Sequence, residues 1–112
     1  MRTRFIVAAA LLASACASQQ STGDAFAQAQ EQALALGSVL GEVEVCDGDA
    51  WQPPFHEFMA AKRERGLDGQ QTAMIATLVG TAQYRSDPAS IDCSADGRAK
   101  RVAALEQQRV QW

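Results

Sequence analysis

The stretch "DAFAQAQEQALALGSVLGEVEVC", residues 24–46, decides the fold, because its apolar residues recur with the period of an α-helix. They are separated by three, four, three, four and three positions, which places them on one helix face. The stripe consists of Phe26, Ala29, Ala33, Leu36, Leu40 and Val43. The pattern predicts a helix from Asp24 to Val43 with a narrow apolar face.

Two glycines, Gly37 and Gly41, lie four residues apart on a flank of this stripe. Each costs about 1 kcal/mol relative to alanine inside a helix. One interpretation is that another helix or a partner protein approaches closely here, which makes both glycines candidate partner-binding residues. The alternative is that they weaken or curve the end of the helix.

A second helix is predicted from Pro53-Pro54, because a missing N–H is harmless in a first helical turn. The preceding segment, Cys46 to Asp49, is predicted as a loop. Gly66 ends the helix. Its apolar face comprises Phe55, Phe58 and Met59, and its last turn carries Lys62, Arg63 and Arg65. Positive charge is favourable beside the negative end of the helix dipole, so this basic cluster needs no ligand.

Two more helices complete an all-α domain. Asp68 and Gln71 have the spacing of a capping box at the start of the third, which Ser86-Asp87-Pro88 stops. Its predicted face is Met74, Ile75, Leu78, Val79 and Ala82. Ser94 or Asp96 can cap a polar fourth helix over 97–111 whose inward residues are Ala99, Val102 and Leu105. With no repeats and no convincing strand pattern, residues 24–112 are predicted to form a single four-helix domain.

The N-terminal segment has the organisation of an export signal. Arg2 and Arg4 precede a short apolar region, Phe5 to Ala13, and small residues follow. A membrane span needs about 20 apolar residues, and the run from Phe5 to Ala17 is shorter than that. Residues 1–15 are therefore predicted to be a cleaved signal peptide.

Cys16 distinguishes two kinds of signal. Ordinary export leaves it as a free residue, whereas a bacterial lipoprotein signal makes it the lipidated first residue. Ala13 holds the position where lipoprotein signals prefer Leu, and Leu12 stands one place too early. The chain has three cysteines, so lipidation of Cys16 leaves an even pair. We therefore predict a lipidated N-terminus and a flexible tether over 16–23.

Similarity to the sorting signals of Gram-negative lipoproteins suggests where the anchor is inserted. Ala17, rather than Asp, follows the cysteine. This implies the inner leaflet of the outer membrane and a periplasmic domain. The similarity also implies three acyl chains, palmitate among them, and two or more chains hold a protein stably on a membrane.

The other two cysteines, Cys46 and Cys93, are predicted to form a disulfide, which an exported protein permits. They lie 47 positions apart. Closing such a loop is worth roughly 4 kcal/mol in the chain-entropy model. The competing interpretation, two reactive thiols, is disfavoured because acidic residues around Cys46 oppose thiolate formation. These are Glu42, Glu44, Asp47 and Asp49.

Charge and motifs point away from nucleic acid and from catalysis. Residues 17–61 hold seven acids and no Lys or Arg, which argues against nucleic acid or anionic lipid as a main partner there. His56 begins a zinc-protease-like segment but has Ala60 where the second histidine belongs. Asp47 and Asp49 begin like a calcium loop, but Trp51 occupies its fifth position. We predict no catalytic residue, no metal site, no cofactor and no enzymatic activity.

The organisation of the chain resembles the secretin pilotins of bacterial type II secretion. The matching features are Cys16 after a lipoprotein signal, a first helix ending at Cys46, "RERGLDGQQ" (63–71), "SIDCSADGR" (90–98) and a closing helix. The resemblance implies a small four-helix outer-membrane lipoprotein with an internal disulfide. It also implies binding to the C-terminal helix of a secretin, which the pilotin carries to the outer membrane.

Two alternatives belong to other classes. One is an all-α periplasmic chaperone resembling acid-stress proteins, which have two cysteines at a similar interval. Those proteins are soluble and unlipidated, which Cys16 contradicts. The other is a structural envelope lipoprotein without such a partner.

The lipid anchor yields a direct prediction. Because small residues precede Cys16 and an uncharged segment follows, the mature chain should begin at an acylated Cys16. Mass spectrometry of the protein purified from envelopes should find the lipid mass on the N-terminal peptide. An unmodified Cys16, or a mature N-terminus at Ser18, would contradict lipidation.

Overall fold

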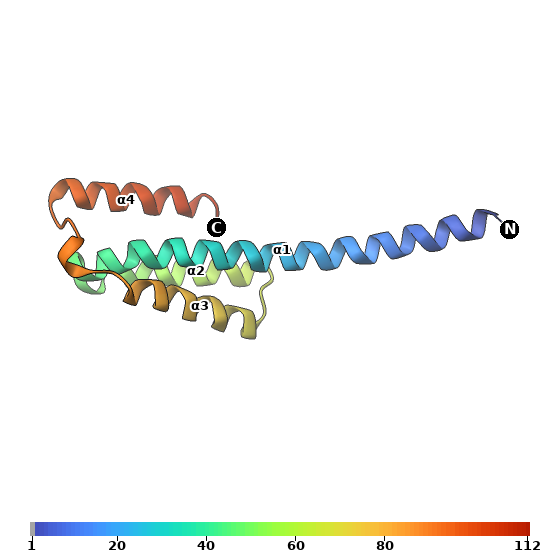
Figure 1. Cartoon of the computed structure of the whole chain (residues 1–112), viewed down its shortest axis with the longest axis horizontal. Coiled ribbons are helices and arrows are strands. Elements are labelled where there is room, and N and C mark those ends of the chain that lie inside the picture. The colour runs from blue at the N-terminus through green and yellow to red at the C-terminus, as the bar shows by residue number, and fades with distance from the viewer. Residues whose placement is uncertain (1) are drawn as a thin grey trace.

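A computed structural model describes the backbone of residues 2–112 and the side chains of residues 23–112 (Figure 1). The signal peptide (1–15), Cys16 and the tether up to residue 22 lie outside the residues with described side chains. The elements in chain order are α1 (Arg2–Asp47), the 3-10 helix η1 (Gly48–Trp51), α2 (Gln52–Glu64), α3 (Gly69–Tyr84), the 3-10 helix η2 (Pro88–Ser90) and α4 (Ala95–Arg109). The predicted all-α class with four α-helices is confirmed. In the part of the chain whose side chains are described, no helix is both long and apolar enough to cross a membrane.

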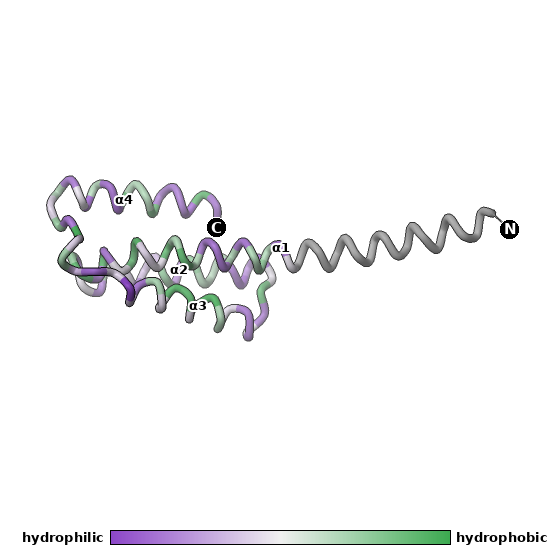
Figure 2. Tube along the Cα trace, in the orientation of Figure 1, coloured by the Kyte–Doolittle hydropathy of each residue, from purple (hydrophilic) through white to green (hydrophobic). Residues whose placement is uncertain are grey.

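The described part of α1 is the central element of the bundle. The other three helices pack against it, and α3 does so along the greatest length. In Figure 1, α3 and α4 lie on opposite sides of α1, and α2 runs alongside it. The tube of α4 carries more hydrophilic residues than that of α3 (Figure 2).

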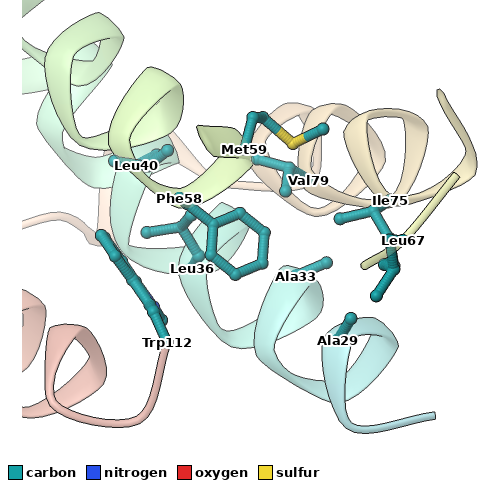
Figure 3. Close-up of a cluster of buried hydrophobic side chains, with 10 residues drawn as sticks. All are labelled: Ala29, Ala33, Leu36, Leu40, Phe58, Met59, Leu67, Ile75, Val79 and Trp112. Atoms are coloured by element: carbon teal, nitrogen blue, oxygen red, sulfur yellow. The ribbon is translucent and has the colours of Figure 1, made fainter. Parts of the chain in front are cut away.

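The hydrophobic core forms where α2 and α3 cover the predicted stripe of α1 (Figure 3). Four stripe residues are completely buried, Val43 is nearly so, and Phe26 is half-buried against the cluster. The core cluster consists of Ala29, Ala33, Leu36, Leu40, Phe58, Met59, Leu67, Ile75, Val79 and Trp112. Full burial of a side chain such as Phe58 or Leu36 contributes about 1.5–3 kcal/mol, so this cluster is the main stabilising contact.

Most predicted helix ends are confirmed by their capping bonds. Asp68 Oδ1 accepts from the Gln71 N–H at 2.8 Å, and Gln71 Oε1 accepts from the Asp68 N–H at 3.1 Å. Ser94 Oγ accepts from the Gly97 N–H at 3.2 Å, which identifies Ser94 as the cap of α4. Gly66 follows α2 with a φ of 95°, a conformation that glycine adopts without steric cost.

Three local predictions are wrong. The segment from Cys46 to Asp49 is not a loop, because α1 continues to Asp47 and η1 follows directly. Met74 is 47% exposed, because only a narrow face of α3 is covered: Thr72, Ile75 and Val79. On α4, Ala99 and Val102 are exposed and only Leu105 is partly buried. Gly97 and Arg101 are the residues of α4 that are buried instead.

The predicted disulfide is confirmed. Cys46 is bonded to Cys93, with a Cα–Cα distance of 5.3 Å and a sequence separation of 47. The bond ties the C-terminal end of α1 to the loop that precedes α4. It therefore fixes where α4 begins.

Gly37 and Gly41 are both buried at the contact between α1 and α3. A methyl group at Gly37 would overlap the main-chain oxygen of Val79 and the Cβ of Ala82. One at Gly41 would overlap Ser86 and approach the main-chain oxygen of Gln83 at 2.7 Å. The close approach of a helix is thus real, and the helix is α3 of the same chain.

Replacing Gly37 tests this contact. Gly37→Ala should lower the free energy of unfolding by about 1–3 kcal/mol, the typical cost of overpacking. Gly80→Ala is the matched control, since nothing lies within 4 Å of its added methyl. That variant should gain up to about 1 kcal/mol of helix propensity. Urea unfolding followed by circular dichroism measures both, and equal stabilisation of the two variants would mean that Gly37 only softens the helix.

Candidate functional site

Polar contacts join α1 and α4 along their seam, beside Leu105, which packs against the core. Gln32 Nε2 donates to the main-chain oxygen of Gln111 at 3.0 Å. Gln108 Nε2 donates to that of Ala35 at 3.4 Å. The two pairs show that α4 runs antiparallel to α1. Since glutamine amides hold the helices together here, the seam leaves space along its length.

Two hollows follow one another along this seam, and we call them together the α1–α4 groove. The wider one measures about 590 Å³ and is lined by Gln28, Glu31, Gln32, Ala35 and Gln111. The narrower one, the Arg101 hollow, measures about 310 Å³ and is lined by Val39, Glu42, Asp92, Gly97, Lys100, Arg101 and Ala104. On α1 the groove extends from residue 28 to residue 42, which corresponds to about 21 Å of helix.

The α1 wall of the groove is acidic, and basic residues of α4 line the Arg101 hollow only. Glu31 and Glu42 line it from α1, whereas Lys100 and Arg101 line it from α4. Small apolar side chains, Ala35, Val39 and Ala104, lie between these charges. The arrangement suits an elongated segment with apolar residues on one face and charged residues beside them.

Contacts at both ends hold α4 in position. At one end, the disulfide is joined by an ion pair between Arg98 and Asp47. At the other end, Arg109 Nε pairs with Glu57 Oε2 at 2.8 Å. Exposed pairs of this kind contribute at most about 1 kcal/mol each, so their effect is mainly to set the orientation of α4.

Trp112 is the apolar anchor of the segment after α4. It is 6% exposed and packs edge-on against Phe58, with the ring centroids 5.3 Å apart. Its main-chain oxygen accepts a hydrogen bond from Lys62 Nζ at 3.2 Å. Sequence reasoning missed this residue because it follows the most polar helix. The signal that could have found it is the residue type, because a tryptophan has a large apolar surface to bury.

Lys62 belongs to the core rather than to the basic surface predicted from the sequence. It is 4% exposed, and its Nζ lies 5.3 Å from the centroid of the Phe58 ring. Desolvation lowers the pKa of Lys62, and the nearby positive charge of Arg65 lowers it further. Arg63 and Arg65 remain exposed, as expected for the end of α2.

The residues that the sequence singled out do not form one site. The prediction that a partner protein contacts Gly37 and Gly41 directly is wrong, because α3 occupies the space beside them. The disulfide cysteines lie where α1 meets the loop before α4, and His56 is exposed beside Phe55. Among residues 23–112, no cluster of His, Cys, Asp or Glu could hold a metal ion.

Comparison of the chain with known protein families, with curated proteins and with solved structures finds no match. The functional argument therefore depends on the groove itself. Its residues escaped the sequence analysis because they are mostly polar residues from two distant segments. No spacing within either segment indicates that they meet.

The burial of Lys62 predicts a dependence of stability on pH. Its pKa is lower in the folded chain than in the unfolded one, so the unfolded chain binds more protons between the two values. The contribution of Lys62 to stability should therefore rise with pH across that window. The difference in unfolding free energy between wild type and Lys62→Met should increasingly favour wild type as the pH rises towards the ordinary pKa of lysine.

Urea unfolding at several pH values measures this shift. Arg63→Met is the matched control, because Arg63 is the exposed base next to Lys62 on α2. The difference in unfolding free energy between Arg63→Met and wild type should not change with pH. A flat profile for Lys62→Met as well would show that the Lys62 ammonium group remains hydrated in the folded chain.

Proposed function

We propose that the chain is a non-enzymatic, pilotin-like lipoprotein of the outer membrane that binds a helical segment of an envelope assembly protein. The C-terminal helix of a secretin is the favoured ligand. The observation that carries the proposal is the α1–α4 groove, two neighbouring hollows along one seam with charged residues and small apolar residues in their walls.

The cysteines support the anchored part of this proposal. Cys46 and Cys93 are bonded to each other, so Cys16 is the one cysteine outside the disulfide. A disulfide that closes a long loop fits an oxidising compartment such as the periplasm. The export signal before Cys16 supplies the route, and the lipid would hold the domain at the inner leaflet of the outer membrane.

The dimensions of the groove suit a helix. About 21 Å along α1 matches roughly 14 residues, or four turns, of a partner helix. Helices bind in grooves through apolar anchors at helical spacing, and Ala35, Val39 and Ala104 leave room for such anchors. Basic residues on the flank of the partner that faces α1 would meet Glu31 and Glu42.

Binding of a secretin peptide tests the proposal. The mature chain with Cys16→Ser should bind the C-terminal helix peptide of a co-encoded secretin with a Kd of tens of micromolar or better, about 6 kcal/mol. Ala35→Leu should weaken this binding roughly tenfold by filling the wider hollow, which corresponds to about 1.4 kcal/mol. Isothermal titration calorimetry measures the affinity, and circular dichroism checks that the helix content is unchanged.

Ala99→Leu serves as the control. Ala99 is an exposed residue of α4, as Ala35 is of α1, and it does not line either hollow. Its affinity should equal that of wild type. No saturable binding by any of the three proteins would exclude the pilotin-like function, and equal loss in both variants would place the contact outside the groove.

A further inference from the structure

The outer side of α3 is an exposed helix face without charge. α3 contains no Asp, Glu, Lys, Arg or His, although 21% of the residues of the chain are charged. Ile75 and Val79 are buried in the core, and the opposite side of α3 lies at the edge of the bundle (Figure 1). We call this side the outer α3 face. It consists of exposed residues that nothing within residues 23–112 covers: Ala73, Met74, Thr77, Gly80, Thr81 and Tyr84.

The chemistry of this face suits a protein contact better than water. Met74 is 47% exposed and Tyr84 is 91% exposed. Thr77 Oγ1 donates to the main-chain oxygen of Ala73 at 3.0 Å, and Thr81 Oγ1 donates to that of Thr77 at 2.9 Å. Because both hydroxyl groups bond within the helix, covering the face leaves neither donor unpaired. The solvated side of a helix usually carries charged residues, and this side carries none.

Small residues in the middle of the outer α3 face let a second helix approach closely. A methyl group added at Gly80 would meet nothing within 4 Å, so the backbone is open to the outside at this point. Ala73 and Thr77 lie on the same side of the helix, one and two turns before Gly80. The distance between packed helices is set by the side chains at their contact, so this one can be short.

The outer α3 face is complementary to itself. In an antiparallel pair of α3 helices with a two-fold axis at Thr77, residues equally far before and after Thr77 lie opposite each other. Ala73 then meets Gly80 of the second copy, and Met74 meets Thr81. Thr77 meets the same residue of the second copy, as a two-fold contact requires. A charge near the axis would repel its own copy, and α3 carries none.

The ends of α3 favour the same orientation. Asp68 precedes the helix and Arg85 follows it, and both are exposed. In the antiparallel pair, Arg85 of each copy lies at the same end as Asp68 of the other, so opposite charges meet. The helix dipoles also oppose each other. A parallel pair would bring like charges together at both ends.

We propose that two copies of the chain associate through the outer α3 face, as an antiparallel pair of α3 helices centred on Thr77. The contact is weak, because a helix of 16 residues is about 24 Å long and one face of it covers less than the roughly 800 Å² per partner of a stable interface. α3 and α4 lie on opposite sides of α1 (Figure 1), so the α1–α4 groove stays open in the pair. The inference does not depend on the proposed function.

Sedimentation equilibrium of the mature chain with Cys16→Ser tests the association. We expect a monomer–dimer equilibrium with a Kd of about 0.1–1 mM, typical of a small contact. Thr77→Arg should raise the Kd at least tenfold, because two positive charges meet at the axis. Gln107→Arg is the matched control, an exposed residue of α4 that receives the same charge, and its Kd should equal that of wild type. Circular dichroism checks that both variants keep their helix content.

A charge swap tests the two-fold arrangement itself. Thr77→Arg and Thr77→Glu should each be monomeric alone, whereas an equal mixture of the two should associate, because opposite charges then meet at the axis. A wild-type chain that stays monomeric at about 1 mM would overturn the proposal. So would a dimer that Thr77→Arg leaves intact, or a mixture that does not associate.

Two other occupants of the face have their own outcomes. If the chain is monomeric but floats with vesicles of phosphatidylethanolamine and phosphatidylglycerol, and Thr77→Arg abolishes flotation, the face contacts lipid and the proposal is wrong. It is also wrong if Thr77→Arg removes binding of the secretin peptide to a monomeric chain. Dimerisation without peptide binding would keep this inference and exclude the proposed function. Peptide binding by a chain that stays monomeric would keep the function and exclude the dimer.

Discussion

The narrow apolar stripe of α1 is the constraint on which the rest of the structure depends. Burying it requires two helices, and α2 and α3 meet that requirement. At Gly37 and Gly41, α3 approaches so closely that no side chain fits between the helices. The remaining flank of α1 is polar, so the fourth helix meets a surface of a different kind.

This difference explains how α4 is attached. An apolar helix would bury a stripe of its own against α1, but α4 has few large apolar residues to bury. It is held at its beginning by the disulfide and the Arg98–Asp47 pair, and at its end by Trp112 and the Arg109–Glu57 pair. Anchoring at both ends leaves the middle of the seam free to be a groove.

Two buried cations show how differently the bundle treats positive charge. Lys62 has a main-chain oxygen to donate to and an aromatic ring beside it, so its burial is compensated within the chain. Arg101 has one main-chain acceptor for a group with five N–H donors. The first cation helps to hold Trp112 in the core. The second lies against the segment that precedes α4 and contacts the main chain of Asp92.

The sequence by itself determined the four helices, most of their ends, the stripe of α1 and the disulfide. These follow from local chemistry: a 3.6-residue period, the Asp68 and Ser94 caps, the glycine after α2 and the even pair of cysteines. Only the tertiary structure decided which faces of α3 and α4 are covered. A wide apolar face such as that of α3, or a polar helix such as α4, allows several orientations, and the neighbouring helices select one. For that reason the exposure of Met74, the burial of Arg101 and Trp112, the helix beside Gly37 and the groove itself were set by packing between segments far apart in the sequence.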